Sequence, residues 1–410
     1  MFQRPRILVF LVLSMLFLLS AVSPAYARYY GGGVLSLSLE RDYWPTEEWQ
    51  TSDPLNYDID TTFLEAMMEE IEDTPHNVHS VLIVKSGYIV WEEYPRSIYN
   101  PTRLHMLQSC TKSFTSTLIG IALHEGFIDN VSQRMVDFFP DRTIANLDSR
   151  KESITLYHML TMSEGMYWTE LDYPYTDDRN TLKQMWDSTD AIQHILDQPM
   201  MRNPGDEWHY NSGMSVLLGA VLEQVTGQSV EEFAEQYLFD RIGIGNYQWY
   251  SMPNSDVLHT DGGLYLSSRD MARLGYLMLN NGTWNGTEIV SSDWVYDATH
   301  SDVQIDSETN YGYQWWLFPE YGFYSATGHY EQKIYVIPEE DLVVVFTANI
   351  ADDKPHPTDR FLLSYVLPSV QQESNSDDGI PVEPIVNLSI LAIIIAPLVV
   401  AGILQYRKLR

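Results

Sequence analysis

The segment Leu107-Gln108-Ser109-Cys110-Thr111-Lys112-Ser113-Phe114 places a serine three residues before a lysine. Apolar residues recur at helical spacing from Phe114 to Ala122, which predicts a largely enclosed helix over residues 109–125. Because residues three apart share one face of a helix, we expect the amine of Lys112 to lie beside the hydroxyl of Ser109.

This pair of side chains is typical of covalent catalysis by serine. A free hydroxyl is a weak nucleophile, so hydrolysis of an amide or ester requires a base within hydrogen-bonding reach. An enclosed lysine loses the solvation of its charged form, which favours the neutral, proton-accepting amine. Ser109 is therefore the predicted nucleophile and Lys112 its predicted base. The spacing alone also arises by chance in a chain of 410 residues, so other segments have to support it.

Four further segments carry a resemblance to a known family. Together with the segment around Ser109, the chain resembles the class C β-lactamase-like, penicillin-binding serine hydrolases, which include esterases, D-aminopeptidases and 6-aminohexanoate-dimer hydrolases. The segments occur in the family's order, and they are Tyr157–Gly165, Asn203–Gly213, Gly262–Ala272 and Tyr311–Trp316. The resemblance extends from about residue 83 to residue 367.

The resemblance implies roles for individual residues. Ser109 resembles the acyl-accepting nucleophile, Lys112 the general base, and Tyr210 the tyrosine that relays a proton to the leaving group. Ser212 stands where many members have asparagine in a Tyr-x-Asn motif, a variant also seen among the dimer hydrolases. The resemblance therefore implies that the protein hydrolyses an amide, a D-amino-acid peptide or a carboxylic ester through an acyl-enzyme.

A third motif departs from the family pattern. Gly328-His329-Tyr330-Glu331-Gln332 resembles a stretch that reads Gly-His-Gly-Gly-Gln in many relatives. The resemblance places His329 at the site and implies that backbone N–H groups of Ser109 and Gln332 form the oxyanion hole. Glu331 replaces a small residue, so we expect it to narrow the site or to repel anionic substrates, with feeble turnover of β-lactams. Without the family, His329 is better explained as a packing or surface histidine.

Strand and helix signals indicate a mixed α/β (α+β) fold. The turn residues Lys85-Ser86-Gly87 between two β-branched stretches predict a hairpin of residues 80–84 and 88–94. Further strands are predicted at 263–266, 311–317, 322–326, 333–337 and 342–348, and helices at 63–71, 216–225, 230–238 and 359–367. We therefore expect an antiparallel sheet built from the two chain ends and flanked by helices, with an inserted, mostly helical region. The resemblance implies the β-lactamase/transpeptidase-like form of this architecture.

Both ends of the chain predict export and membrane attachment. Residues 1–27 have the basic, apolar and small-residue order of a secretory signal, although an uncleaved anchor is an alternative. Residues 384–404 are apolar and uncharged, and basic residues follow in 405–410, which predicts a membrane span with a cytoplasmic tail. The segments between them are predicted as an N-terminal extension (28–60), a hydrolase domain (61–367) and a flexible stalk (368–383). The catalytic domain of this single-pass cell-membrane protein is then extracytoplasmic.

Composition excludes several other classes. The formal net charge of −32 repels phosphate backbones and excludes nucleic acid as a partner. Cys110 is the only cysteine, and it points about 100° away from Ser109 on a helix, so buried packing is favoured over a thiol nucleophile. No zinc-protease motif follows His124-Glu125 and no Gly-x-Ser-x-Gly elbow is present, so we expect neither metal nor cofactor.

Two functional hypotheses remain open. The first is a serine hydrolase acting on a small-molecule or peptide-like substrate, with an oligomeric state that the sequence leaves undetermined. The second is a catalytically inactive cell-surface binding or scaffold protein of the same fold, which the altered motif at residues 328–332 favours.

Overall fold

The structure is a computed structural model that describes residues 41–73, 76–351 and 357–371. The predicted signal segment, membrane span and cytoplasmic tail lie outside these residues, as do most of the stalk and the first part of the N-terminal extension. Within the described ranges, no helix combines the length and the apolar character needed to cross a bilayer. The membrane attachment therefore stays a prediction.

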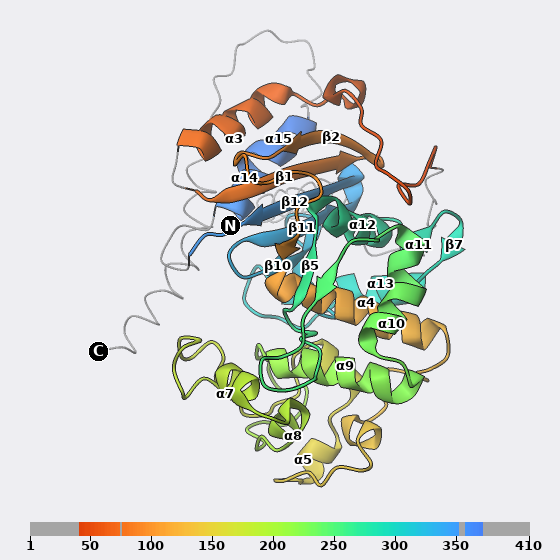
Figure 1. Ribbon diagram of the computed structural model, residues 1–410, viewed down its shortest axis with the longest axis vertical. Coiled ribbons are helices and arrows are strands. Elements are labelled where there is room, and N and C mark those ends of the chain that lie inside the picture. The colour runs from red at the N-terminus through yellow and green to blue at the C-terminus, as the bar shows by residue number, and fades with distance from the viewer. Residues whose placement is uncertain (1–40, 74–75, 352–356, 372–410) are drawn as a thin grey trace, which may run out of the picture. The chain divides into compact units, whose positions relative to one another are not determined.

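A seven-stranded antiparallel sheet joins the two ends of the described chain (Figure 1). Its strand order is β2-β1-β12-β11-β10-β9-β8. The bounds are β1 Val78–Lys85, β2 Tyr88–Glu93, β8 Asn310–Tyr311, β9 Trp316–Phe318, β10 Phe323–Gly328, β11 Gln332–Ile337 and β12 Leu342–Ala348. The sheet predicted from the two chain ends is therefore confirmed.

The hairpin of β1 and β2 follows from its turn residues. Lys85 pairs with Tyr88, and Ser86 and Gly87 between them have φ values of 51° and 89°. Two positive φ values in a two-residue loop match the twist of antiparallel strands. On its other edge, β1 pairs with β12, with Val81 opposite Phe346.

Both faces of the central strands are buried, which explains why β1 and β12 read as nearly continuous apolar runs. Side chains alternate between the faces, so Leu82 and Val84 join one apolar cluster while Val81 and Ile83 join another. The first cluster includes residues of α4 (Thr111–His124) and α12 (Ser268–Leu279), and the second includes residues of α3 (Thr61–Asp73) and α14 (Thr358–Phe361). The sheet thus lies between two helical layers.

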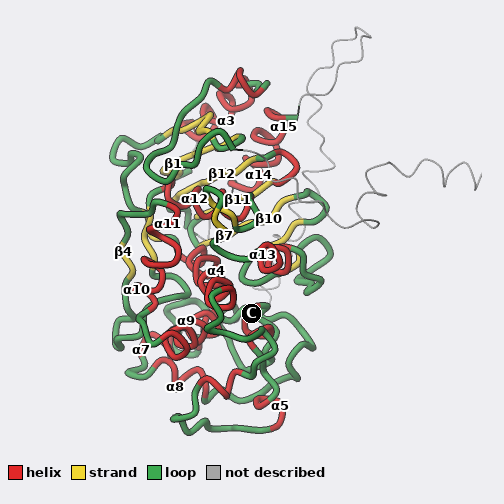
Figure 2. The backbone as a smooth tube through the Cα atoms, turned by 90° about the vertical axis from the view of Figure 1, so that its right-hand side faces the viewer, coloured by secondary structure: helices red, strands yellow, loops and turns green. Residues whose placement is uncertain are grey.

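A mostly helical region lies between the two groups of strands in the sequence, and its part from residue 149 to residue 196 lies at the opposite end of the described domain from the sheet (Figure 2). Its helices are α5 Ser149–Glu152, α6 Leu156–Leu160, α7 Thr181–Asp187, α8 Ala191–Leu196, α9 Ser212–Thr226, α10 Val230–Ala234 and α11 Asp240–Ile242. The remaining described α-helices are α13 Ser292–Thr299 and α15 Leu367–Val370, and two π-helical turns are Glu235–Phe239 and Leu362–Val366. Short 3-10 helices are η1 Pro54–Tyr57, η2 Gln108–Cys110, η3 Met135–Phe138 and η5 Pro338–Glu340. This insertion agrees with the prediction.

Two strand predictions were wrong in detail. The segment 311–317 is a hairpin of β8 and β9 rather than one strand, because Gln314 has a φ of 63° between them. The segment 263–266 forms β5 (Leu264–Leu266), but β5 pairs with β3 (His105–Met106) and β4 (Gln248–Trp249) in a separate sheet. A small pair of β6 (Thr283–Trp284) and β7 (Thr287–Glu288) completes the described strands.

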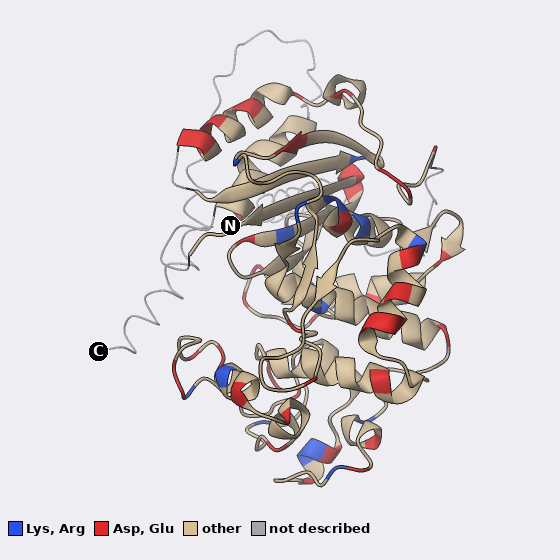
Figure 3. Cartoon of the chain, in the orientation of Figure 1, with Lys and Arg blue, Asp and Glu red and all other residues tan. Residues whose placement is uncertain are grey.

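The described part of the N-terminal extension packs on the domain. The indole N–H of Trp49 donates to the carbonyl of Arg269 at 3.0 Å, and the ring of Trp44 lies 5.4 Å from that of Trp284. Arg41 forms an ion pair with Asp341 at 2.7 Å. Elsewhere on the molecule, acidic side chains are spread over outer helices and loops, including α3 and α10 (Figure 3).

Candidate active site

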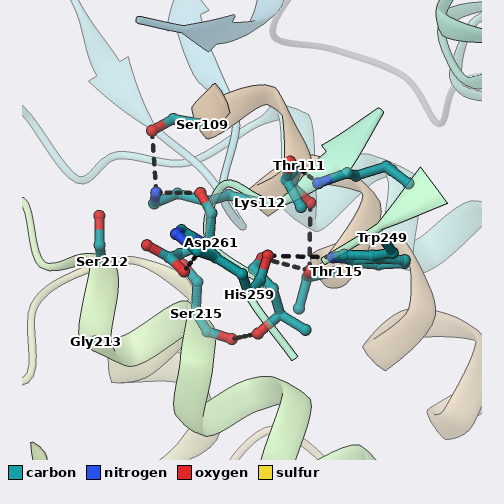
Figure 4. A network of polar contacts seen from close by, with 12 residues as sticks. Ser109, Thr111, Lys112, Thr115, Ser212, Gly213, Ser215, Trp249, His259 and Asp261 are labelled. Atoms are coloured by element: carbon teal, nitrogen blue, oxygen red, sulfur yellow. Dashed lines mark hydrogen bonds and ion pairs between the residues drawn. The ribbon is translucent and has the colours of Figure 1, made fainter. Parts of the chain in front are cut away.

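Ser109 and Lys112 meet where η2 continues into α4 (Figure 4). Ser109 lies in η2, Lys112 lies in the first turn of α4, and the lysine Nζ is 3.0 Å from the serine Oγ. Lys112 is only 2% exposed. The predicted proximity of hydroxyl and amine in a sheltered place is therefore present.

The surroundings of Lys112 determine its charge. Its Nζ donates to the main-chain carbonyl of Asp261 at 2.7 Å and lies 5.3 Å from the ring centroid of Tyr210. Burial lowers the pKa of Lys112, and the negative charges of Asp261 and Glu170 oppose that shift. The lowered pKa enlarges the neutral fraction of the amine, which is the form that can accept a proton.

Tyr210 lies two residues before α9 and beside Ser109. It is buried, and burial raises the pKa of its phenol, as does the negative charge of Glu170, while hydrogen bonds with Ser109 and Ser212 act in the opposite direction. The phenol is therefore protonated at ordinary pH and can donate. Asn211 caps α9 by accepting a hydrogen bond from the N–H of Gly213 at 2.9 Å, which fixes the backbone next to Tyr210.

Ser212 faces a carboxylate that the sequence analysis missed. Its hydroxyl donates to Glu170 Oε1 at 2.7 Å, and its backbone N–H donates to Glu170 Oε2 at 2.9 Å. The indole N–H of Trp168 also donates to Oε2, at 2.9 Å. Glu170 is 3% exposed. The hydroxyl of Ser212 thus donates its hydrogen bond to a buried glutamate. Many members of the family that the sequence resembles have an asparagine at this position.

The end of β10 lies against the turn that carries the nucleophile. A Cβ atom at Gly328 would be 2.3 Å from the carbonyl oxygen of Leu107 and 3.2 Å from the backbone nitrogen of Cys110, so no larger residue fits there. The thiol of Cys110 donates to the carbonyl of Gln332 at 3.2 Å. Gln332, a predicted oxyanion-hole residue, therefore lies beside the segment that carries Ser109.

The ring of His329 contacts two aromatic neighbours. Its ring stacks on Tyr330 with centroids 3.9 Å apart, and it meets Tyr175 edge-on at 5.4 Å. The side chain is half-buried. A direct role for His329 at the nucleophile stays a prediction.

The expectation that Glu331 narrows the site was wrong, and its predicted repulsion of anionic substrates stays a prediction. Its carboxylate is buried and accepts hydrogen bonds from the backbone N–H and the hydroxyl of Thr358, the first residue of α14. Tyr330 and Glu331 have φ values of 61° and 69°, and these two left-handed residues direct the side chain to Thr358. Glu331 therefore binds the start of a helix instead of narrowing the site, and the feeble turnover of β-lactams likewise stays a prediction.

Cys110 has the packing role that the sequence favoured. It is fully buried, and burial raises the pKa of its thiol, so the reactive thiolate is suppressed. Among the described residues, no three His, Cys, Asp or Glu side chains are grouped so as to hold a metal ion.

Sequence reasoning also missed an ion pair next to Lys112. His259 Nδ1 lies 2.7 Å from Asp261 Oδ1, and both side chains are largely buried. The one available signal was position, because Asp261 directly precedes the Gly262-Gly263 pair that opens a family-like segment.

Comparison with known proteins agrees with this geometry. A family model described as Beta-lactamase matches residues 72–366. The 6-aminohexanoate-dimer hydrolase of Paenarthrobacter ureafaciens is 25% identical over 327 residues, covering 73% of this chain and 81% of that protein.

Solved structures share the fold. EstCE1, described as a hydrolase with promiscuous acyltransferase activity, has a TM-score of 0.63 at 14% identity and covers 76% of this chain and 98% of its own. A D-stereospecific amidohydrolase from Streptomyces sp. has a TM-score of 0.58 at 14% identity, with coverages of 75% and 98%. These likenesses support the β-lactamase/transpeptidase-like fold. Since the family model matches well over half of the residues, the chain belongs to the Beta-lactamase family, a β-lactamase-fold family of serine hydrolases.

Proposed function

We propose that this protein is a serine hydrolase that cleaves a carboxylic amide, a D-amino-acid peptide or a carboxylic ester through an acyl-enzyme on Ser109. The observation that carries the proposal is the 3.0 Å approach of the Lys112 amine to the Ser109 hydroxyl. A second support is the lowered pKa of that buried amine, because a base is effective only in its proton-accepting form.

The first half-reaction forms the acyl-enzyme. Ser109 transfers its hydroxyl proton to Lys112 while Oγ forms a bond to the substrate carbonyl carbon. Backbone N–H groups of Ser109 and Gln332 stabilise the negative oxygen of the tetrahedral intermediate. Tyr210 donates a proton to the leaving nitrogen or oxygen as the scissile bond breaks, and the proton held by Lys112 restores the phenol.

The second half-reaction releases the acid. A water molecule attacks the carbonyl carbon of the Ser109 ester, and its proton passes to the same base. The ester bond breaks, Ser109 regains its proton, and the carboxylic acid leaves. A relative is named 6-aminohexanoate-dimer hydrolase, and structural neighbours are named a D-stereospecific amidohydrolase and a family VIII carboxylesterase, which supports both amide and ester chemistry.

The proposed location is the outer face of a cell membrane. It is supported by the signal-like residues 1–27 and by the apolar segment 384–404 with its basic flank. A protease added to intact cells should remove the domain, and protection until the cells are opened would contradict this placement.

The chemistry is tested by covalent labelling with a fluorophosphonate probe, using the full-length chain in detergent. We expect labelling of the natural protein and none of Ser109→Ala. Ser116→Ala is the matched control, because Ser116 is a buried serine on the same helix, and it should be labelled like the natural protein. Absence of labelling in the natural protein, or equal labelling of Ser109→Ala, would favour the inactive scaffold.

A further inference from the structure

The loop before β5 is fastened to the helix that carries the base. Lys112 Nζ donates to the carbonyl of Asp261 at 2.7 Å, and the hydroxyl of Thr115 donates to the carbonyl of Thr260 at 2.7 Å. Lys112 and Thr115 are three residues apart and lie on one face of α4. The Thr260 hydroxyl donates in turn to the carbonyl of Ser215 in α9, at 3.0 Å. The carbonyl groups of Thr260 and Asp261 are therefore fixed in position relative to Lys112 (Figure 4).

The side chain of Asp261 points to a histidine of the same loop. His259 Nδ1 lies 2.7 Å from Asp261 Oδ1, and the two side chains are 13% and 3% exposed. The ring of Trp186 lies 5.8 Å from that of His259, and the indole N–H of Trp249 donates to the His259 carbonyl at 3.1 Å. The ion pair is enclosed, so water screens it only weakly.

Two glycines make room for this arrangement. A Cβ atom at Gly262 would be 3.0 Å from Cε1 of His259. A Cβ atom at Gly263 would be 2.6 Å from the His259 Cβ and 2.8 Å from the carbonyl oxygen of Tyr250. The glycine pair therefore lets His259 fold back over its own loop onto Asp261.

We propose that His259 and Asp261 are positioning residues for Lys112, forming a buried ion pair behind the amine that directs one of its protons to the Asp261 carbonyl and leaves its lone pair facing Ser109. This inference rests on the proposed function. A neutral amine has two N–H bonds and one lone pair. Because the Asp261 carbonyl holds one N–H bond, the lone pair has only two remaining directions, and one of them faces Ser109.

The charges around Lys112 give the pair a second effect. Asp261 and Glu170 are the acidic groups whose charge acts on Lys112, and Tyr210 and Cys110 beside it are buried with raised pKa values, so they stay neutral. Burial opposes ionisation of the ion pair, but attraction raises the pKa of His259 and lowers the pKa of Asp261. The positive charge of His259 therefore offsets the negative charge of Asp261, which otherwise favours protonated Lys112.

The test is the pH profile of kcat/KM for a p-nitrophenyl ester, measured with the full-length protein. The acid limb reports loss of the neutral amine as the pH falls. Asp261→Asn keeps the main-chain carbonyl and removes the negative charge, so the acid limb should move to lower pH. His259→Gln removes the positive charge and leaves Asp261 uncompensated, so the limb should move to higher pH. Each shift should reach roughly half a pH unit to one unit.

The double variant Asp261→Asn with His259→Gln should give a limb between those of the two single variants. A merely structural role lowers kcat/KM without moving the limb in opposite directions. Shifts in the same direction, or no shift in either variant, would overturn the proposal. Gly262→Ala provides a milder route, because the added methyl group displaces the His259 ring, and it should shift the limb in the direction of His259→Gln.

Failure of the two proposals can be told apart. If Ser109→Ala retains the esterase activity, the proposed function fails and the profile concerns another site. If Ser109→Ala abolishes activity and the limbs stay in place, Ser109 chemistry stands and the inference about His259 and Asp261 fails.

Discussion

Two buried lysines in different regions of the molecule have different hydrogen-bond partners. Lys112 lies beside Ser109 and Lys151 lies on α5 in the helical region, and they are 2% and 0% exposed. Burial lowers the pKa of both, that of Lys151 to about 8. Lys151 Nζ donates to the carbonyls of Ala145 and Leu196, both at 2.8 Å, whereas Lys112 has one carbonyl partner and one hydroxyl partner.

The partners, and not the burial, distinguish the proposed base Lys112 from Lys151. Both carbonyl partners of Lys151 can only accept hydrogen bonds, so its amine holds two segments together. Lys112 instead faces the hydroxyl of Ser109, a group with a proton to give. We therefore expect the hydrogen-bond partner of a buried lysine, more than its burial, to determine whether the neutral amine can accept a proton from another group.

The matched substitutions Lys112→Met and Lys151→Met test this comparison and have the largest expected effect. We expect Lys112→Met to lower ester hydrolysis and fluorophosphonate labelling by about 10³-fold, because general-base catalysis contributes about 10²- to 10⁴-fold. Lys151→Met should keep the labelling rate of the folded protein within about twofold and should lower its free energy of unfolding by roughly 2–3 kcal/mol, through two lost hydrogen bonds. Labelling rates and urea unfolding check both outcomes. A reversal of the two phenotypes would break the comparison.

The buried carboxylate of Glu164 extends the comparison from buried lysines to a buried acid. Glu164 is fully buried, and burial raises its pKa to about 7 against the hydrogen bond from Asn211. With a raised folded-state pKa, its favourable contribution is complete below the unfolded value near 4.5 and is lost as the pH rises through about 7. The stability of Glu164→Gln should therefore come closest to that of the natural protein at pH 5 and should exceed it most at pH 8.5, by up to about 3 kcal/mol.

Thermal unfolding at pH 5, 7 and 8.5 measures this difference. A stability gap between Glu164→Gln and the natural protein that stays constant with pH would show that Glu164 keeps an ordinary pKa.

Glu331→Gln has the smallest expected effect. Because the Glu331 carboxylate is bound by Thr358, we expect the ratio of kcat/KM for an anionic and a neutral ester to change by less than about twofold, with a stability loss of about 1 kcal/mol. The ratio is measured with two p-nitrophenyl esters that differ in one carboxylate. A tenfold gain for the anionic ester would show that the Glu331 charge does reach the substrate.

The parts of the site that are local in sequence could be predicted. Ser109 and Lys112 are one helical turn apart, so periodicity alone places them together. Glu170 and His259 could not be found in this way, because they reach the site from loops whose course depends on tertiary packing. The direction of the Glu331 side chain could not be predicted, because it depends on positive φ values at Tyr330 and Glu331. The sequence gives no signal for a positive φ at residues other than glycine.

The fold divides in the same manner. The hairpin at Ser86-Gly87 and the strand at 342–348 carry strong local signals, and both were predicted correctly. The segment 311–317 has the composition of a single strand, but the left-handed Gln314 turns it back on itself. Its side-chain amide donates to the carbonyl of Leu160 at 3.0 Å, a long-range contact that no periodic pattern encodes.

The pairing of β1 with β12 also implies a delay during biosynthesis, because the two strands are far apart in the sequence. Val81 pairs with Phe346, and ribosomes add about 5–20 residues per second, so β1 waits for its partner for roughly 13 to 53 seconds. During that interval the N–H and C=O groups along one edge of β1 are unpaired and open to other chains, and such edges favour aggregation. Nascent copies are therefore open to strand-to-strand association until residue 346 has been added.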